Sequence, residues 1–131
     1  MTLTLKNYSR ALLCGLWFSD SCNEDGLKCT EYANMTADGS FEFAFSTFDK
    51  NGQLIEKAIE LGDWGLVGDI HFTMTKNEMV DEELYAADLN NEDNYHAYKV
   101  LQLNHQIFEY QHIVTNETYI MRRVVDNIGH C

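Results

Sequence analysis

The chain lacks proline, has few basic residues and contains no long apolar run. Because proline is absent, glycine, asparagine and aspartate must supply the turns. Nine Lys and Arg residues stand against 21 Asp and Glu residues, which gives a formal net charge of −12. Nucleic-acid phosphates and anionic membranes bind clustered basic residues, so we expect no nucleic-acid partner. A transmembrane helix needs roughly 18 consecutive apolar residues, so we expect no membrane insertion either.

The cysteines also exclude one class of site. Cys14, Cys22, Cys29 and Cys131 contain no CxxC pair, a spacing that structural zinc sites usually use, and we expect neither a metal nor a cofactor. Cys22 and Cys29 flank a polar loop and could form a disulfide at a hairpin end. The alternative is four reduced thiols in a cytoplasmic protein, which the absence of a visible export signal favours; a signal peptide cleaved before residue 1 is a further alternative.

What the chain does contain is enough apolar sequence for a core. Hydrophobic residues make up 45% and aromatic residues 12% of its 131 residues. A chain of this length buries about two-thirds of its unfolded surface. We therefore expect one domain that spans residues 1–131.

The clearest β pattern lies between Ser40 and Lys76. Phe41, Phe43 and Phe45 recur at period two, which is typical of a strand with one apolar face. Asp38-Gly39 and Asn51-Gly52 are turn signals, and we interpret Gly62-Asp63 as a third turn. The next strand then carries five apolar residues of one parity on a shared face: Trp64, Leu66, Ile70, Phe72 and Met74.

Other segments of the chain show similar strand patterns. Further strands are predicted at 12–19, 28–36, 53–61, 95–103, 107–114 and 117–125, and the acid-rich segment 77–94 fits either a strand or a helical turn. Short links between consecutive strands require antiparallel pairing. Apolar residues on both parities require a sandwich or a closed barrel, and sequential hairpins favour the up-and-down barrel.

Gly15-Leu16-Trp17 on the first predicted strand resembles the GxW motif of lipocalins and related calycin barrels. The resemblance implies that Trp17 closes one end of the barrel and that an arginine of the last strand, Arg122 or Arg123, packs across its ring. The predicted fold is all-β: a single antiparallel up-and-down β-barrel of about eight strands, lipocalin-like. The resemblance also implies a cavity for a small hydrophobic molecule.

The candidate cavity residues come from the aromatic strands and from the polar residues of the late strands. The predicted ligand-binding residues are Phe41, Phe43, Phe45, Trp64, Phe72, His96, Tyr98, Tyr110 and His112, and Lys57 and His71 are further candidates for the lining. The alternative is that the aromatic residues only pack against one another as a core. Which parity points inward decides between these two interpretations.

Three functions remain compatible with this pattern. The first is non-catalytic binding of a small hydrophobic or amphipathic molecule inside the barrel. The second is an isomerase- or dehydratase-like enzyme that uses His96 and Tyr98, or Tyr110 and His112, as an acid–base pair. The third is an interaction protein that forms a homodimer through the barrel exterior, motivated by strands with apolar residues on both faces, especially Tyr98, Val100 and their neighbours.

Overall fold

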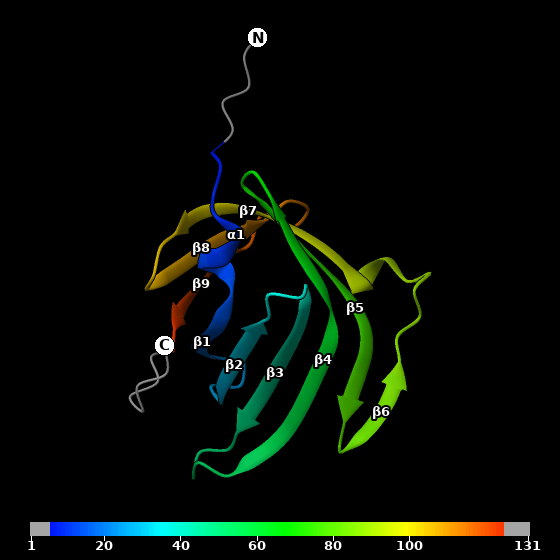
Figure 1. Ribbon diagram of the computed structural model, residues 1–131. Helices are drawn as coiled ribbons and strands as arrows, with labels where there is room; N and C mark the ends of the chain where they lie inside the picture. Colours follow the sequence, from blue (N-terminus) through cyan, green and yellow to red (C-terminus); the bar gives the residue numbers. More distant parts are fainter. Residues whose placement is uncertain (1–5, 125–131) are drawn as a thin grey trace.

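The computed structural model describes residues 6–124 and consists almost entirely of antiparallel β-strands (Figure 1). A single helical turn, α1 (Arg10–Leu13), precedes the strands. The strands are β1 (Gly15–Cys22), β2 (Lys28–Met35), β3 (Ser40–Phe48), β4 (Leu54–Val67), β5 (Ile70–Val80), β6 (Glu83–Ala86), β7 (Tyr95–Leu103), β8 (Ile107–His112) and β9 (Thr118–Arg123). A 3₁₀ turn, η1 (Glu92–Asn94), leads into β7.

The strands close into a barrel. The sheet runs β4-β3-β2-β1-β9-β8-β7-β5, and β4 also pairs with β5, which completes a ring of eight strands. The closing contact between first and last strand pairs Trp17 with Arg123 and Phe18 with Arg122. The predicted antiparallel up-and-down barrel of eight strands is therefore confirmed.

The ninth strand, β6, lies outside this ring. One edge of β5 pairs with β4 over its whole length. The other edge pairs with β7 at residues 70–74 and with β6 at residues 77–80. β6 therefore extends the wall only at one end of the barrel, where Figure 1 shows it beside the lower half of β5.

The prediction of a turn at Gly62-Asp63 is wrong. β4 continues through both residues to Val67, and the chain reverses at Gly68, which has a φ of +63°. Gly62 instead lies where the β4–β5 register shifts, and a Cβ atom there would lie 1.9 Å from the carbonyl oxygen of Met74. A glycine that marks a bulge and a close backbone approach looks the same in sequence as one that marks a turn.

The position of this turn changes which side chains share a face. Val67 pairs with Ile70, and paired residues of antiparallel strands point to the same side of the sheet. The even-numbered residues Trp64 and Leu66 therefore share the inner face with the odd-numbered His71. The predicted shared face of five apolar residues is wrong for its last three members, because Ile70, Phe72 and Met74 point outward.

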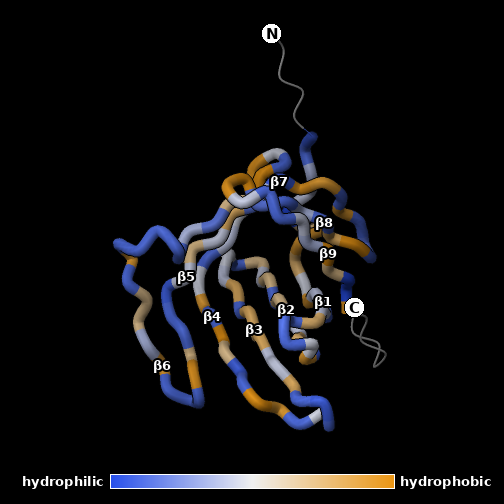
Figure 2. Tube along the Cα trace, turned by 180° about the vertical axis from the view of Figure 1, so that it is seen from behind, coloured by the Kyte–Doolittle hydropathy of each residue, from blue (hydrophilic) through white to orange (hydrophobic). Residues whose placement is uncertain are grey.

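Several predicted boundaries also move. Residues 12 and 13 belong to α1, and the first strand begins at Gly15. The acid-rich segment is neither one strand nor a helix: it contains the end of β5, β6, a loop and η1. The loop is hydrophilic over most of its length, as Figure 2 shows. The last predicted strand ends at Arg123, and Val125 lies outside the described residues.

Within residues 6–124 the cysteines are not bonded to one another. Cys22 pairs with Lys28 and Cys29 with Ser21 in the β1–β2 ladder, and Cys14, Cys22 and Cys29 are free thiols. The disulfide alternative is therefore not formed here, and Cys131 lies outside the described residues. Within the described residues, no helix is both long enough and apolar enough to cross a membrane.

Candidate functional site

The end of the barrel next to α1 is closed by a buried tryptophan. Trp17 is 0% exposed, and its indole Nε1 donates a hydrogen bond of 2.9 Å to the carbonyl oxygen of Leu13. The guanidinium of Arg123 lies 4.3 Å from the centre of the Trp17 ring, as a cation–π contact requires. Arg123 also donates to the carbonyl oxygens of Cys14 and His105, each over 2.8 Å, and to that of Leu12.

Only glycine fits at position 15, because of its backbone conformation and the nearby arginine. Its φ is +127°, and a Cβ atom there would lie 2.4 Å from Nη1 of Arg123. The first glycine of the GxW motif therefore leaves room for the arginine that covers the tryptophan. The predicted arginine–tryptophan stack is confirmed for Arg123, whereas Arg122 pairs with Phe18 on the neighbouring strand and is exposed.

A second arginine–tryptophan pair lies at the same end. The guanidinium of Arg10 lies 4.5 Å from the centre of the Trp64 ring, and Nε1 of Trp64 donates to the carbonyl oxygen of Thr36 over 2.9 Å. Phe41 is 3% and Trp64 4% exposed. These two predicted ligand-binding residues therefore belong to the packed floor, together with Leu13, Met35, Val100, Leu103, Phe108 and Met121.

The other half of the barrel is hollow. A cavity of about 200 Å³ is lined by residues from six strands of the ring: Glu31, Phe43, Phe45, Glu60, His96, Tyr98, Tyr110 and Tyr119. A smaller void of about 30 Å³ shares part of this lining and reaches His71 and Trp17 at the floor. The structure thus brings together five predicted cavity residues (Phe43, Phe45, His96, Tyr98 and Tyr110) and adds three that were not predicted.

Two of the added residues are carboxylates with perturbed acidity. Burial raises the pKa of Glu31 to about 7, and the negative charge of Glu60 adds to the shift. Burial also raises the pKa of Glu60, and the negative charge of Glu78 raises it further. The hydrogen bond of 3.1 Å from Oγ1 of Thr75 and the imidazole of His96 partly offset this rise. The two carboxyl groups share one cavity, and the charge of Glu60 makes Glu31 harder to ionise.

Three tyrosines form one wall of the cavity. The Tyr110 ring stacks on Tyr119 at 5.4 Å and meets Tyr98 edge to face at 5.0 Å. Burial raises the pKa of all three, to about 12 for Tyr119. The phenols therefore stay protonated at neutral pH. The hydroxyls of Tyr98 and Tyr110 can both donate and accept hydrogen bonds, whereas that of Tyr119 already donates to Glu117.

His71 lies at the bottom of this lining. It is 3% exposed, and its Nδ1 lies 3.1 Å from the carbonyl oxygen of Gly65. Since a carbonyl only accepts, Nδ1 carries the proton. Burial lowers the pKa of His71 to about 4, so the ring is neutral at physiological pH and its Nε2 lone pair is free of a proton.

His96 and His112 are hydrogen-bonded to each other. Nδ1 of His112 accepts from the backbone N–H of Val114 at 3.1 Å and of Thr115 at 3.3 Å, so the proton of a neutral ring must be on Nε2. That Nε2 then donates to Nδ1 of His96 over 3.1 Å. Both rings contact Tyr98 through their faces and edges, at centroid distances of 6.2 and 5.1 Å, and the described residues contain no His–Tyr hydrogen bond.

Phe72 and Lys57 do not lie in the cavity. Phe72 points outward because of the turn at Gly68, is 42% exposed, and lies over Gly65, where a Cβ atom would come within 2.3 Å of its ring. The prediction that it binds ligand inside the barrel is wrong for this geometric reason. Lys57 pairs with Ser46 and lies on the outer surface of β4.

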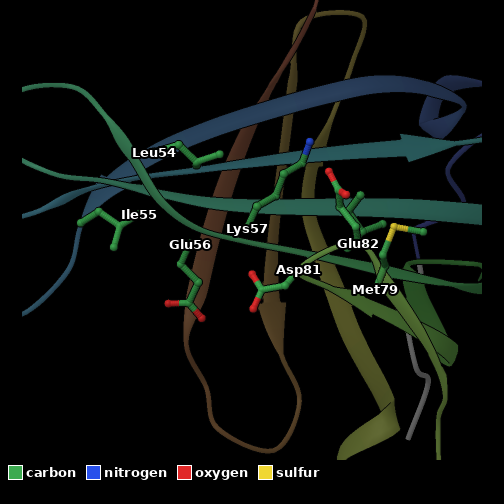
Figure 3. Close-up of a pocket in the computed structure, with 8 residues that line it drawn as sticks. Leu54, Ile55, Glu56, Lys57, Met79, Asp81 and Glu82 are labelled. Carbon is green, nitrogen blue, oxygen red and sulfur yellow. The ribbon is translucent and has the colours of Figure 1, made fainter.

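A separate groove of about 440 Å³ lies on that outer surface. It runs along the start of β4 and the β5–β6 turn and is lined by Leu54, Ile55, Glu56, Lys57, Ile59, Met79, Asp81 and Glu82. Figure 3 shows the polar ends of Glu56 and Lys57 pointing to opposite sides of the strand. The groove therefore lacks the converging polar groups that distinguish the interior cavity.

The carboxylates could have been found from the sequence by following the register. The Asp38-Gly39 turn pairs Glu31 with Phe45 and Ala33 with Phe43. If the three phenylalanines point inward, Glu31 must do so too. Glu60 needed the second turn as well, since it pairs with Phe43 across β3 and β4.

Comparison with known proteins adds little to these observations. No family model matches the chain, and no curated protein matches its sequence. Among solved structures it is similar to a lipocalin-like protein from Bacteroides uniformis, with 17% identity and a TM-score of 0.49 over 86% of this chain and 99% of that one. The strand order, the closed ring and the Arg123–Trp17 stack, observed in the structure itself, give this chain a lipocalin-like β-barrel fold.

Proposed function

We propose that this barrel binds a small amphipathic molecule in its open half and performs no chemistry on it. The observation that carries the proposal is the cavity of about 200 Å³, with aromatic walls and polar groups above a packed floor. Ligand sites are usually concave and apolar, with a few polar groups that fix orientation. An eight-stranded barrel has an interior of the right size for one small ligand.

The size and lining of the cavity narrow the class of ligand. Its volume of about 200 Å³ lies below the range of roughly 300–1,000 Å³ that is typical for drug-sized ligands. A wholly apolar molecule would displace water from the carboxylate of Glu31 without replacing its hydrogen bonds, and would leave Glu60 with only its bond from Thr75, which is costly. An amphipathic ligand can pack against the aromatic rings and form hydrogen bonds with the polar groups of the lining. It is therefore proposed over a purely hydrophobic one.

Binding is proposed over catalysis because of how the polar groups are arranged. An acid–base pair requires hydrogen-bond reach and a pKa near the working pH. His96 and His112 meet Tyr98 through ring contacts, and the pKa of Tyr98 is raised far from neutrality by burial. Such a tyrosine is suited to hold a ligand by a hydrogen bond.

The dimer hypothesis loses the two residues that it named. Val100 is 2% exposed and belongs to the core, and Tyr98 lines the cavity. Neither side chain is available to an interface on the barrel exterior.

A ligand screen with one matched pair of variants tests the proposal. Small amphipathic molecules are screened by thermal shift and native mass spectrometry, and each hit is measured again with Phe45→Trp and Phe18→Trp. Phe45 lines the cavity, whereas Phe18 packs on Tyr32 on the outer face. We expect one-to-one hits that Phe45→Trp weakens and Phe18→Trp leaves unchanged. No stabilising ligand, or hits that ignore Phe45→Trp, would refute it.

A further inference from the structure

We propose that the ligand is a small organic cation, a primary ammonium ion with an aromatic or apolar body, held between Glu31 and Glu60. This inference rests on the proposed function and names the chemical class of its ligand. Three features of the cavity carry it: two carboxylates that have no cationic partner, a wall of aromatic rings, and one tyrosine hydroxyl that is accessible from the cavity.

The carboxylates lack a counter-charge. Glu31 and Glu60 both line the cavity, and the ion pair found within residues 6–124 joins Lys76 to Asp63 on the surface. The basic group that acts on Glu60 is the imidazole of His96, and no basic group acts on Glu31. Buried carboxylates in proteins are normally paired. A cationic ligand would supply the missing partner to both groups at once.

The aromatic walls suit a positive charge. Phe43, Phe45, Tyr98, Tyr110 and Tyr119 line the same cavity, and Phe43 meets Phe45 edge to face at 6.5 Å. Aromatic faces carry negative charge density and attract cations, especially where water is excluded. An anionic ligand would face both ring faces and carboxylates of its own sign.

The hydroxyl of Tyr110 points to a ligand independently of the carboxylates. Tyr110 is 8% exposed and lies on the cavity wall. None of the hydrogen bonds found within residues 6–124 involves its hydroxyl, and no fully buried polar side-chain atom there lacks a partner, so the hydroxyl is accessible from the cavity. A ligand in the cavity can therefore reach this oxygen. A primary ammonium group has three N–H donors, which matches two carboxylates and one phenol oxygen.

A metal ion fits the cavity less well than an organic cation. The residues that the structure describes contain no group of three or more His, Cys, Asp or Glu side chains that could hold a metal. Calcium and magnesium require six or more oxygen ligands, largely from protein and water. The five aromatic residues of the lining can instead cover the apolar body of an organic molecule.

Cation binding must be coupled to proton release. The titratable groups that line the cavity with Glu31, or act on Glu60, come from five strands: Glu60, Glu78, His71, His96, Tyr98, Tyr110 and Tyr119. A fraction of Glu31 is protonated at neutral pH, since its pKa is about 7. A bound cation favours the ionised form, so binding releases a proton and affinity rises between pH 6 and pH 8.

The test uses three ligands of similar shape and different charge: 2-phenylethylamine, 2-phenylethanol and 3-phenylpropionate. Affinities are measured by isothermal titration calorimetry at pH 7.5 on the full chain. We expect the amine to bind at least about tenfold more tightly than the alcohol, with no measurable binding of the carboxylate. Titration in two buffers of different ionisation enthalpy should show net proton release for the amine.

Three single substitutions locate the effect. Glu31→Gln and Glu60→Gln each preserve shape and remove one charge, and each should reduce the preference for the amine over the alcohol several-fold, roughly. Glu42→Gln is the control, because Glu42 on β3 pairs with Asn34 of β2 and is exposed. Thermal unfolding of each variant verifies that it is folded.

The outcomes separate the inference from the proposed function. Alcohol binding that equals or exceeds amine binding overturns the cation assignment and leaves an amphipathic cavity intact. Amine binding that Glu31→Gln and Glu60→Gln do not weaken also overturns the assignment. Failure of all three probes together with a screen that yields no ligand overturns the proposed function itself.

Discussion

The two ends of the barrel have opposite character. At the floor, Trp17 and Trp64 are buried, each is covered by an arginine, and each indole N–H donates to a backbone carbonyl. In the open half, Glu31 and Glu60 lie in a cavity without a cationic side chain beside them, and their pKa values are raised. At the floor, the indole groups are hydrogen-bonded to the protein itself. In the cavity, several polar groups remain available to a ligand.

This difference shows where the sequence favours stability and where it favours function. Natural proteins depart from good packing and full polar satisfaction mainly at functional sites. In this barrel the departures are confined to one half, and the other half supplies the packing that tolerates them. Substitutions in the two halves should therefore affect stability to different extents.

The largest effect is expected for matched truncations on β3. Phe41→Ala removes a ring from the packed floor, and we expect a loss of about 3–5 kcal/mol in the free energy of unfolding. Phe45→Ala removes a half-buried ring that already borders the cavity, and the loss should be less than half of that. Urea denaturation measures both losses. Equal losses would contradict the conclusion that the floor is packed more tightly than the open half.

The next effect depends on pH and is a gain in stability, in contrast to the losses expected for the truncations. The folded-state pKa of Glu31 is raised to about 7, so the protonated carboxyl contributes stability at low pH that is lost as pH rises through 7. Glu31→Gln should therefore stabilise the ligand-free protein by about 2–3 kcal/mol at pH 8 and change little at pH 4.5. The same pair of measurements on Glu42→Gln should show no pH-dependent gain, and a pH-independent effect of Glu31→Gln would count against a buried carboxylate.

A smaller loss is expected at the arginine that covers the floor. Lysine in place of Arg123 cannot donate to three carbonyl groups from one planar head group, and its contact with Trp17 is weaker. We expect Arg123→Lys to cost about 2 kcal/mol, whereas Arg122→Lys, at an exposed neighbour, should cost almost nothing. Thermal unfolding of the two variants measures this, and equal effects would mean that the stack does not stabilise the floor.

The smallest effect tests the outer face. Phe72→Ala exposes Gly65 and should cost about 1 kcal/mol, because the ring is already 42% exposed. Ligand affinity should not change, since the side chain points away from the cavity. Calorimetry with 2-phenylethylamine on this variant would reveal an inward position if the affinity fell.

The barrel was predictable from the sequence because its hairpins are local. Phe41, Phe43 and Phe45 alternate cleanly, and Asp38-Gly39 sets their register with β2. The floor was predictable from Gly15 and Trp17 only through resemblance to a family, since nothing in their spacing shows that an arginine of the last strand covers the ring.

The cavity was predictable only in part, because the side of the sheet to which a side chain points depends on the exact position of the preceding turn. Gly62 and Gly68 look alike in sequence, yet Gly62 lies at a bulge and Gly68 at the turn. That difference reversed the facing of Phe72, which the sequence pattern had placed on the inner face. Charged residues such as Glu31 and Glu60 are usually exposed, so amino-acid type alone would have placed both on the surface.

The most direct test of the open half as a binding site is a ¹H–¹⁵N NMR titration with 2-phenylethylamine. The account predicts chemical-shift changes at Glu31, Phe43, Phe45, Glu60 and Tyr110, with little change at the outer groove of Leu54 to Ile59. Chemical-shift changes centred on that groove would contradict the account. A titration in which the signals of the cavity residues do not shift would contradict it as well.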